Sequence, residues 1–247
     1  MLPALVGFAA GSLVATTHAA FWRTLPSLGA VSLGDAIGWT PAVGLQLAAF
    51  AAIALAAKGY ERRRLGDVRG VQPPVRGWRR VVHGPWPLAA GAVALAALNA
   101  LVVVLAGHPW GITWGITLAG AKAASALGLD LSRIAFWRDG FPADALAAPL
   151  LADQTAMMDA GIVLGALLAA GLAGRFHAGR VSVSRAAVAL GGGLLLGYGA
   201  RLAFGCNIGA YFSGIASTSL HGWLWLAGAL LGTPIGVALR RRAGLDT

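Results

Sequence analysis

The sequence predicts an all-α membrane protein, a polytopic helical bundle with short broken or re-entrant helices. Hydrophobic residues make up 57% of its 247 residues, charged residues only 11%, and the mean hydropathy is +0.72. A soluble domain carries about 25% charged residues, so this chain has too little charge to cover a water-exposed surface. The apolar runs are long and do not alternate, which favours spanning helices over barrel strands.

Seven apolar segments are expected within one integral membrane domain covering 1–247. The first begins almost at the first residue, and the second is shorter than the roughly 20 residues that a crossing needs. Together they indicate a multi-pass protein surrounded by the lipid bilayer. The predicted segments are 3–22, 41–57, 86–106, 110–128, about 149–173, 186–203 and 221–239.

The loop of about 58–83 is the most basic part of the chain, with eight lysines and arginines against Glu61 and Asp67. Pro73 and Pro74 end any helix there, and the positive-inside rule predicts a cytoplasmic loop. Binding of anionic lipid heads is the functional alternative, but a topology signal is the preferred interpretation. The net charge of +10 does not indicate a nucleic-acid partner, because the basic residues cluster beside apolar segments.

Loop charge also limits the number of crossings. Segment 174–185 carries three arginines and is predicted to be cytoplasmic, as is the arginine triplet 240–242. Two cytoplasmic loops must be separated by an even number of crossings, yet three apolar segments lie between the basic loops. Either one of the three does not cross, or 129–148 hides another element. After residue 185, the segment between 203 and 221 must enter the membrane and return, which predicts broken helices.

That returning segment contains Cys206, the only cysteine of the chain, between Gly205 and Asn207. Polar groups at membrane depth usually face a cavity or a pathway, and glycines let backbone approach a ligand closely. Arg201 and Gly209 belong to the same run. We therefore expect this run to line a substrate path, with plain packing of a small buried thiol as the alternative for the cysteine.

The chemistry of these residues suits an anion. Arg201 supplies a fixed positive charge, a half-helix N-terminus supplies backbone donors, and the Cys206 thiol is a weak donor with a polarisable sulfur. Lys122 is a further candidate ligand, with snorkelling to the interface as its alternative. Interfacial anchoring is the alternative for Arg201, and His221 is expected to be a hydrogen-bonded turn residue. These features alone predict a generic anion site.

Enzymatic motifs are absent from the sequence. The five histidines have no metal-ligand spacing, and the chain contains no P-loop, nucleophile elbow or metalloprotease motif. A single cysteine forms neither an internal disulfide nor a redox pair. We expect no enzymatic activity, no cofactor and no metal. A membrane thiol enzyme would need a second redox group.

The run from Gly205 to Trp223 resembles the C-terminal signature of the YeeE/YedE family of sulfur-compound transporters, and His108–Trp114 and Ala19–Trp22 resemble further family segments. The resemblance implies uptake of thiosulfate, or a related small sulfur anion, across the bacterial inner membrane. It implies a helical bundle of pseudo-symmetric halves, with short helices pointing to a central path. Permeases of this family are thought to pass the substrate along cysteine thiols.

Only Cys206 is carried over as such a pathway thiol, with Asn207 and Gly209 as members of its loop. Family members usually have a further cysteine in a Gly-Cys loop of the first half, and the abrupt apolar start at Met1 agrees with missing N-terminal helices. The chain therefore resembles the later portion of a longer member. A late gene start, a separate chain carrying the missing half, or a reduced member that forms a homo-oligomer would explain this. The alternative function is a non-transporting subunit that packs against a partner carrying the rest of the path.

Overall fold

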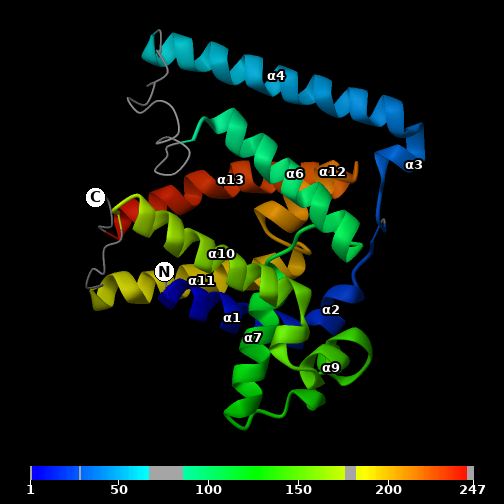
Figure 1. The fold of residues 1–247 in the computed structure, drawn as a ribbon, viewed down its shortest axis with the longest axis vertical. Coiled ribbons are helices and arrows are strands. Elements are labelled where there is room, and N and C mark those ends of the chain that lie inside the picture. The colour runs from blue at the N-terminus through cyan, green and yellow to red at the C-terminus, as the bar shows by residue number, and fades with distance from the viewer. Residues whose placement is uncertain (1, 28, 67–85, 176–181, 244–247) are drawn as a thin grey trace.

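The computed structural model describes residues 2–27, 29–66, 86–175 and 182–243. Across these ranges the chain is helical, with no strand longer than one isolated bridge between Ser32 and Ser219. The predicted all-α class is confirmed (Figure 1). Most of the basic loop 58–83, and residues 176–181 of the second basic loop, lie outside the described residues.

The helices follow the predicted order. Five of those described are long and apolar enough to cross a membrane, namely α4, α6, α10, α11 and α13. The elements are α1 (Leu2–Thr17), α2 (Ala19–Arg23), α3 (Leu33–Ile37), α4 (Trp39–Leu65), α6 (Leu88–Ala106), α7 (Thr113–Ala126), η1 (Leu131–Arg133), α8 (Ala135–Arg138), α9 (Gly140–Ala147), η2 (Leu150–Ala152), α10 (Gln154–Leu172), α11 (Val183–Leu202), η3 (Asn207–Phe212), α12 (Ser213–Ala216) and α13 (Leu220–Arg242).

Helix α4 differs from its predicted bounds. It has 27 residues and continues through 58–65, which were expected to belong to the basic loop. Alanine, glutamate, lysine and arginine are good helix formers, so the basic residues extend the helix beyond its apolar part. Gly66, with φ +73°, then ends it. Long basic side chains at such an end can reach the interface while their stems stay apolar.

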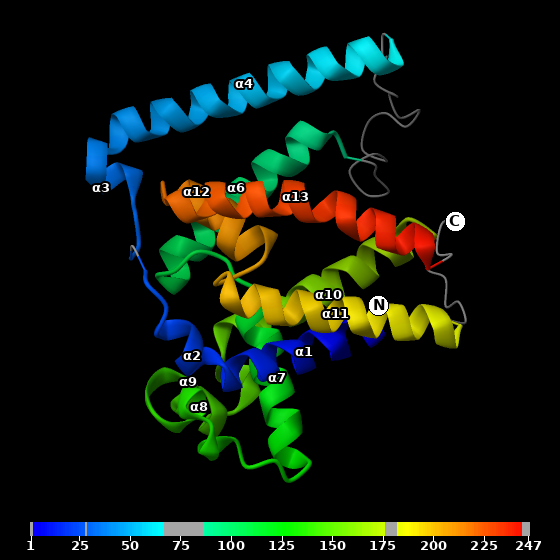
Figure 2. The same ribbon diagram turned by 180° about the vertical axis from the view of Figure 1, so that it is seen from behind.

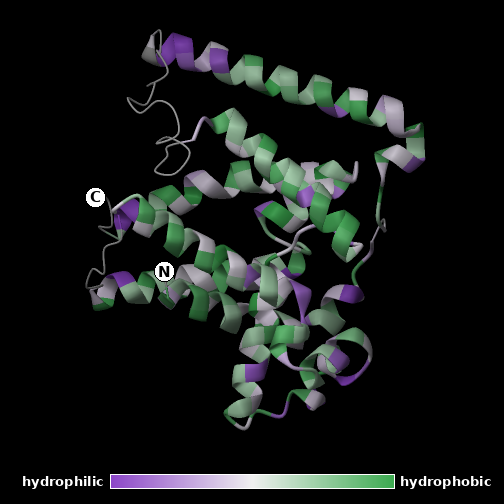
Figure 3. Ribbon diagram, viewed as in Figure 1, coloured by the Kyte–Doolittle hydropathy of each residue, from purple (hydrophilic) through white to green (hydrophobic). Residues whose placement is uncertain are grey.

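The basic ends of the long helices lie on one side of the molecule. In Figures 1 and 2 the C-terminal ends of α4, α10 and α13 and the N-terminal end of α11 share that side. Figure 3 shows hydrophilic residues at the ends of α4 and α13 there. This arrangement agrees with the loop charges, from which the sequence analysis predicted that these ends are cytoplasmic.

Helix α7 is the shortest of the three apolar helices between the two basic loops. It has 14 residues, about 21 Å of helix, which is shorter than the roughly 30 Å hydrocarbon core. Figure 1 shows it running steeply across α1 and α11. Segment 129–148 holds η1, α8 and α9, each too short to cross, so the alternative that one of the three apolar segments does not cross is favoured. Leu118, Ala121, Leu131 and Trp137 form a buried core cluster in this part.

Helices α1 and α11 are packed in parallel through glycines. A β-carbon at Gly7 would overlap the backbone of Leu190, and one at Gly193 would overlap the backbone of Ala4. The next glycine of each helix repeats the relation, so exchanging the helices maps each contact onto another. Small residues allow such close helix contact in membranes. The corresponding residues are Ala4, Gly7, Phe8 and Gly11 in α1 and Leu190, Gly193, Leu194 and Gly197 in α11.

The same two-fold relation continues at the isolated bridge. The Leu33 amide donates to the Thr218 carbonyl, and the Leu220 amide donates to the Val31 carbonyl, both at 2.9 Å. Helices α3 and α13 both begin at this bridge, each with a serine whose side chain accepts from the first helical turn. The bridge therefore holds the starts of two helices from opposite ends of the chain together.

Candidate functional site

A sharp turn after α11 positions the cysteine. Phe204 has φ +52° and Gly205 has φ +151°, and the Gly205 amide donates to the Ala200 carbonyl at 2.9 Å. A β-carbon at Gly205 would lie 2.6 Å from the Ala210 nitrogen. Both the backbone conformation and the close approach therefore require glycine, which explains the Gly-Cys pair in the sequence.

Cys206 lies at the start of the short helix that follows this turn. Its carbonyl accepts from the amides of Ala210, at 2.9 Å, and Tyr211, at 3.3 Å, which opens η3 into a π-helix. Such π-turns frequently occur at functional sites. Helix η3 continues directly into α12. As at the start of any helix, its first amides have no acceptor within the helix and present a partial positive charge. The thiol is free and half-buried.

The short helices η3 and α12 connect the end of α11 to the start of α13. Helix α11 runs away from the basic side, η3 and α12 lie at its far end, and α13 runs back (Figures 1 and 2). The described structure therefore has a broken helix at 203–206, and η3 with α12 does not form a separate crossing. This places the cysteine loop on the side opposite the basic ends.

Arg201 occupies the last turn of α11, one helical turn before the loop. Its guanidinium carbon lies 5.9 Å from the centroid of the Trp114 ring and 5.3 Å from that of Phe136. Its Nη1 atom is buried and has no hydrogen-bond partner among the described residues. A half-buried cation with an unused donor and no carboxylate partner within the described chain is a suitable anion ligand.

The other predicted residues are placed differently. Asn207 is exposed at the first position of η3, and Gly209 is half-buried in the same helix. Lys122 is on α7, away from this loop in sequence, and its ammonium donates to the carbonyls of Leu146, at 2.7 Å, and Ala148, at 2.5 Å. An ammonium has three donors, so one remains. The loop therefore gathers the cysteine, the asparagine and both glycines, and Lys122 stabilises the end of α9.

Three further residues escaped the sequence analysis as site candidates. Trp114, in the repeat Gly-Ile-Thr-Trp-Gly-Ile-Thr, supports Arg201 and donates its indole N–H to the Asp153 carboxylate at 2.8 Å. Asp159 has both carboxylate oxygens buried, and the His221 Nε2 is buried as well, each without a partner in the described ranges. A carboxylate inside an apolar segment is itself a signal, so Asp159 could have been found.

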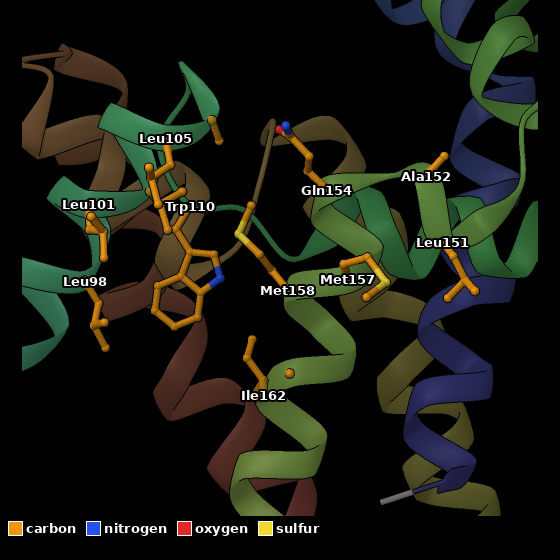
Figure 4. A pocket seen from close by; sticks show the side chains of 13 residues that line it. Leu98, Leu101, Leu105, Trp110, Leu151, Ala152, Gln154, Met157, Met158 and Ile162 are labelled. Atoms are coloured by element: carbon orange, nitrogen blue, oxygen red, sulfur yellow. The ribbon is translucent and has the colours of Figure 1, made fainter.

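A cavity of about 600 Å³ lies between α6 and α10. Figure 4 shows Leu98, Leu101 and Trp110 on one side of it and Met157 and Met158 on the other. Its walls are almost entirely apolar and contain neither Cys206 nor Arg201, so they offer no charged donor to an oxyanion. The candidate anion ligands Arg201 and Cys206 therefore lie outside the lining of this cavity.

Comparison with known proteins decides the family. Residues 1–235 match the family described as sulphur transport. The chain belongs to the sulphur transport family. This membership confirms the predicted YeeE/YedE resemblance, and with the five long apolar helices it makes the chain a multi-pass membrane protein. No solved structure matches the chain.

Curated relatives in the sulphur transport family cover part of the chain. It is 27% identical over 155 residues to the probable transporter YedE of Salmonella typhimurium, and 26% identical to the YedE of Escherichia coli. These matches span 61% of this chain and 37% of each YedE protein. It is also 43% identical over 65 residues to the thiosulfate transporter TsuA of Spirochaeta thermophila, which is 26% of this chain and 20% of TsuA. Membership and these relatives support transport of sulfur compounds.

Proposed function

We propose that this chain is a transporter, or a portion of one, that moves thiosulfate or a related small sulfur anion across the bacterial inner membrane. The observation that carries the proposal is the buried Nη1 of Arg201, which has no partner in the described chain. Arg201 precedes the free thiol of Cys206 by five residues. A positive charge with an unused donor and a polarisable sulfur, five residues apart in the same run, suit an anion that has oxygen atoms at one end and a sulfur atom at the other.

Each residue of the loop has a distinct part in this proposal. Arg201 takes the oxyanion end through its free guanidinium N–H, and the first amides of η3 supply further donors. The Cys206 S–H contacts the terminal sulfur without forming a covalent bond. Gly205 and Gly209 keep β-carbons away from the backbone that the anion approaches, and the exposed Asn207 amide completes the donor set. Lys122 has no part in this site, because its ammonium is bonded to the carbonyls of Leu146 and Ala148 at the end of α9.

The negative charge of the substrate opposes its entry into the cell. Moving a divalent anion into a cell with a negative interior costs a free energy of about 2.3 kcal/mol per charge for every 100 mV of membrane potential. A dry path also costs the anion its hydration. Arg201 offsets part of that cost, because it places a positive charge in the last turn of α11, which leads into the cysteine loop on the side opposite the basic ends.

The second candidate is a non-transporting membrane subunit. The observation that favours it is coverage, since the matched region spans only 37% of each YedE protein. In this reading a partner chain, or a second copy of this chain, supplies the rest of the path. The apolar faces of α4 and α6 are exposed, which fits either lipid or a partner.

Uptake of labelled thiosulfate separates these candidates. The full chain is expressed in cells that lack their own route, beside Cys206→Ala, Cys206→Ser and the exposed-site control Arg138→Met. We expect uptake by the unmodified chain and the control, and its loss in both cysteine variants at equal membrane abundance. Equal uptake by all four removes the thiol from the mechanism. No uptake by any of them contradicts a self-sufficient transporter and favours the subunit.

A further inference from the structure

The carboxyl of Asp159 is the least satisfied polar group of the described chain. It lies in α10 among apolar residues, about 8 Å along the helix from its start. Both of its oxygens are buried, and neither has a hydrogen-bond partner among the described residues. A carboxylate at membrane depth is costly when charged and unpaired. The neutral, protonated acid is the form that this environment favours.

The partner surface of Asp159 is the backbone of α7. A β-carbon at Gly115 would overlap the Oδ2 atom of Asp159 and would lie 2.8 Å from the Cα of Ala156. Gly115 is the second glycine of the tandem repeat that begins at Gly111. The repeat therefore leaves room for this carboxyl, whereas Met157 and Met158 of the same helix turn toward the apolar cavity (Figure 4).

No described cation compensates Asp159. The only titratable side chain on α7 is Lys122, whose ammonium donates to the carbonyls of Leu146 and Ala148 at the end of α9. Helix η2 contributes none. On α10 itself, Asp153 caps the helix by accepting from the Ala156 amide and also accepts the Trp114 indole N–H, so it adds negative charge. Arg201, from α11, lies over the Trp114 ring.

We propose that Asp159 is a proton-binding site that couples proton movement to anion transport, an inference that rests on the proposed function. The proton binds one carboxylate oxygen from the side opposite the basic ends, giving a neutral acid. It leaves from the same oxygen to the basic side after the anion has crossed. No bond other than this O–H forms or breaks, and no electron is transferred. A proton carried inward with the anion offsets part of the charge that opposes its entry.

Helix α7 connects this site to the anion site. Trp114 and Gly115 are adjacent, and they contact Arg201 and Asp159 respectively. A shift of α7 that follows anion binding at Arg201 therefore changes the contact that buries Asp159. In the proposal α7 has two arrangements that both sites bias, which is the condition for coupling between them, and such coupling of binding free energies is reciprocal.

The test uses the full chain reconstituted in lipid vesicles and compares Asp159→Asn, Asp159→Glu and the exposed control Asp144→Asn. Asparagine has the shape of the protonated acid and cannot titrate. We expect a pH gradient with the acidic side outside the vesicles to raise net thiosulfate uptake by the unmodified chain at least about fivefold. This is the low end of typical coupling between two sites. Asp159→Asn abolishes that stimulation but still exchanges internal for external thiosulfate. Asp159→Glu restores part of the stimulation, and the control behaves as the unmodified chain.

Infrared spectroscopy supplies a measurement that does not depend on transport. At neutral pH the reconstituted chain shows the C=O stretch of a protonated carboxyl, which Asp159→Asn removes and Asp144→Asn retains. Absence of that band overturns the proton site. If the chain exchanges thiosulfate but its net uptake does not respond to the pH gradient, the coupling is wrong and the proposed function stands. If thiosulfate moves in neither mode, the proposed function and the coupling both fail, and the band still decides whether Asp159 holds a proton.

Discussion

The guanidinium of Arg201 lies over the indole ring of Trp114, with its central carbon 5.9 Å from the ring centroid. The same indole donates its N–H to Asp153 at 2.8 Å. The ring is thereby fixed by α10 while its face supports a cation from α11. A stacked arginine keeps its N–H groups at the edge available, which leaves the buried Nη1 without a partner in the described chain.

Replacing Arg201 tests this arrangement. Arg201→Gln removes the charge, and a charge-assisted hydrogen bond is worth about 1.5–3 kcal/mol, so we expect the apparent KM for thiosulfate to rise at least about tenfold. Arg201→Lys keeps the charge but not the planar stack, and should give an intermediate value. Uptake kinetics at equal membrane abundance measure both. Unchanged KM in the glutamine variant would show that the guanidinium only anchors the helix.

The two glycines of the tandem repeat are expected to differ. Gly115→Ala places a methyl group against the Asp159 carboxylate and the Ala156 backbone, and overpacking of this kind costs about 1–3 kcal/mol. Gly111→Ala meets nothing within 4 Å and serves as the matched control. Thermal unfolding of the two variants in detergent decides the point. Equal Tm values would mean that α7 and α10 are not packed as closely as the structure shows.

Three consecutive glycines in α11 provide a second matched pair. Gly193→Ala would overlap the Ala4 backbone in α1, whereas Gly192→Ala meets nothing within 4 Å. Alanine is favoured over glycine in helices by about 1 kcal/mol. We expect Gly192→Ala to raise the Tm slightly and Gly193→Ala to lower it. A Gly193→Ala chain as stable as the unmodified one would contradict the parallel α1–α11 contact.

Thr218 is expected to stabilise the bridge between the chain ends. It is buried, has φ +57°, and its Oγ1 accepts from the Gly34 amide at 3.0 Å. Thr218→Ala leaves that amide unsatisfied, which costs about 1–3 kcal/mol. The neighbouring exposed change Ser217→Ala should stay within about 0.5 kcal/mol of the unmodified chain. Chemical denaturation in detergent gives both values, and equal losses would refute the assigned role of Thr218.

Much of the fold could be predicted from local sequence. Length and apolarity identify spanning helices because the bilayer requires every backbone group to bond within its own segment. The glycine before Cys206 and the parity of the basic loops together predicted the broken helix that α11 and η3 form. The predicted end of the segment 41–57 was wrong, because the good helix formers in 58–65 extend α4 past its apolar residues.

The site could be predicted only in part. Cys206, Gly205, Asn207 and Gly209 are close in sequence, so a local motif places them in one loop. Arg201 was a candidate from its position, but its support by Trp114 depends on α7. Asp159 was not a site candidate from the sequence, because burial of both its oxygens depends on the α7 backbone.

By itself the sequence determined the membrane class, the order of the helices and the side of the basic ends, because each depends on composition or on neighbours within a few residues. Only the tertiary structure decided which helices pair and which polar groups lose their water. Gly7 and Leu190 meet, and Gly115 and Asp159 meet, across long stretches of chain. Such contacts depend on the shapes of two surfaces at once, and no single segment contains that information.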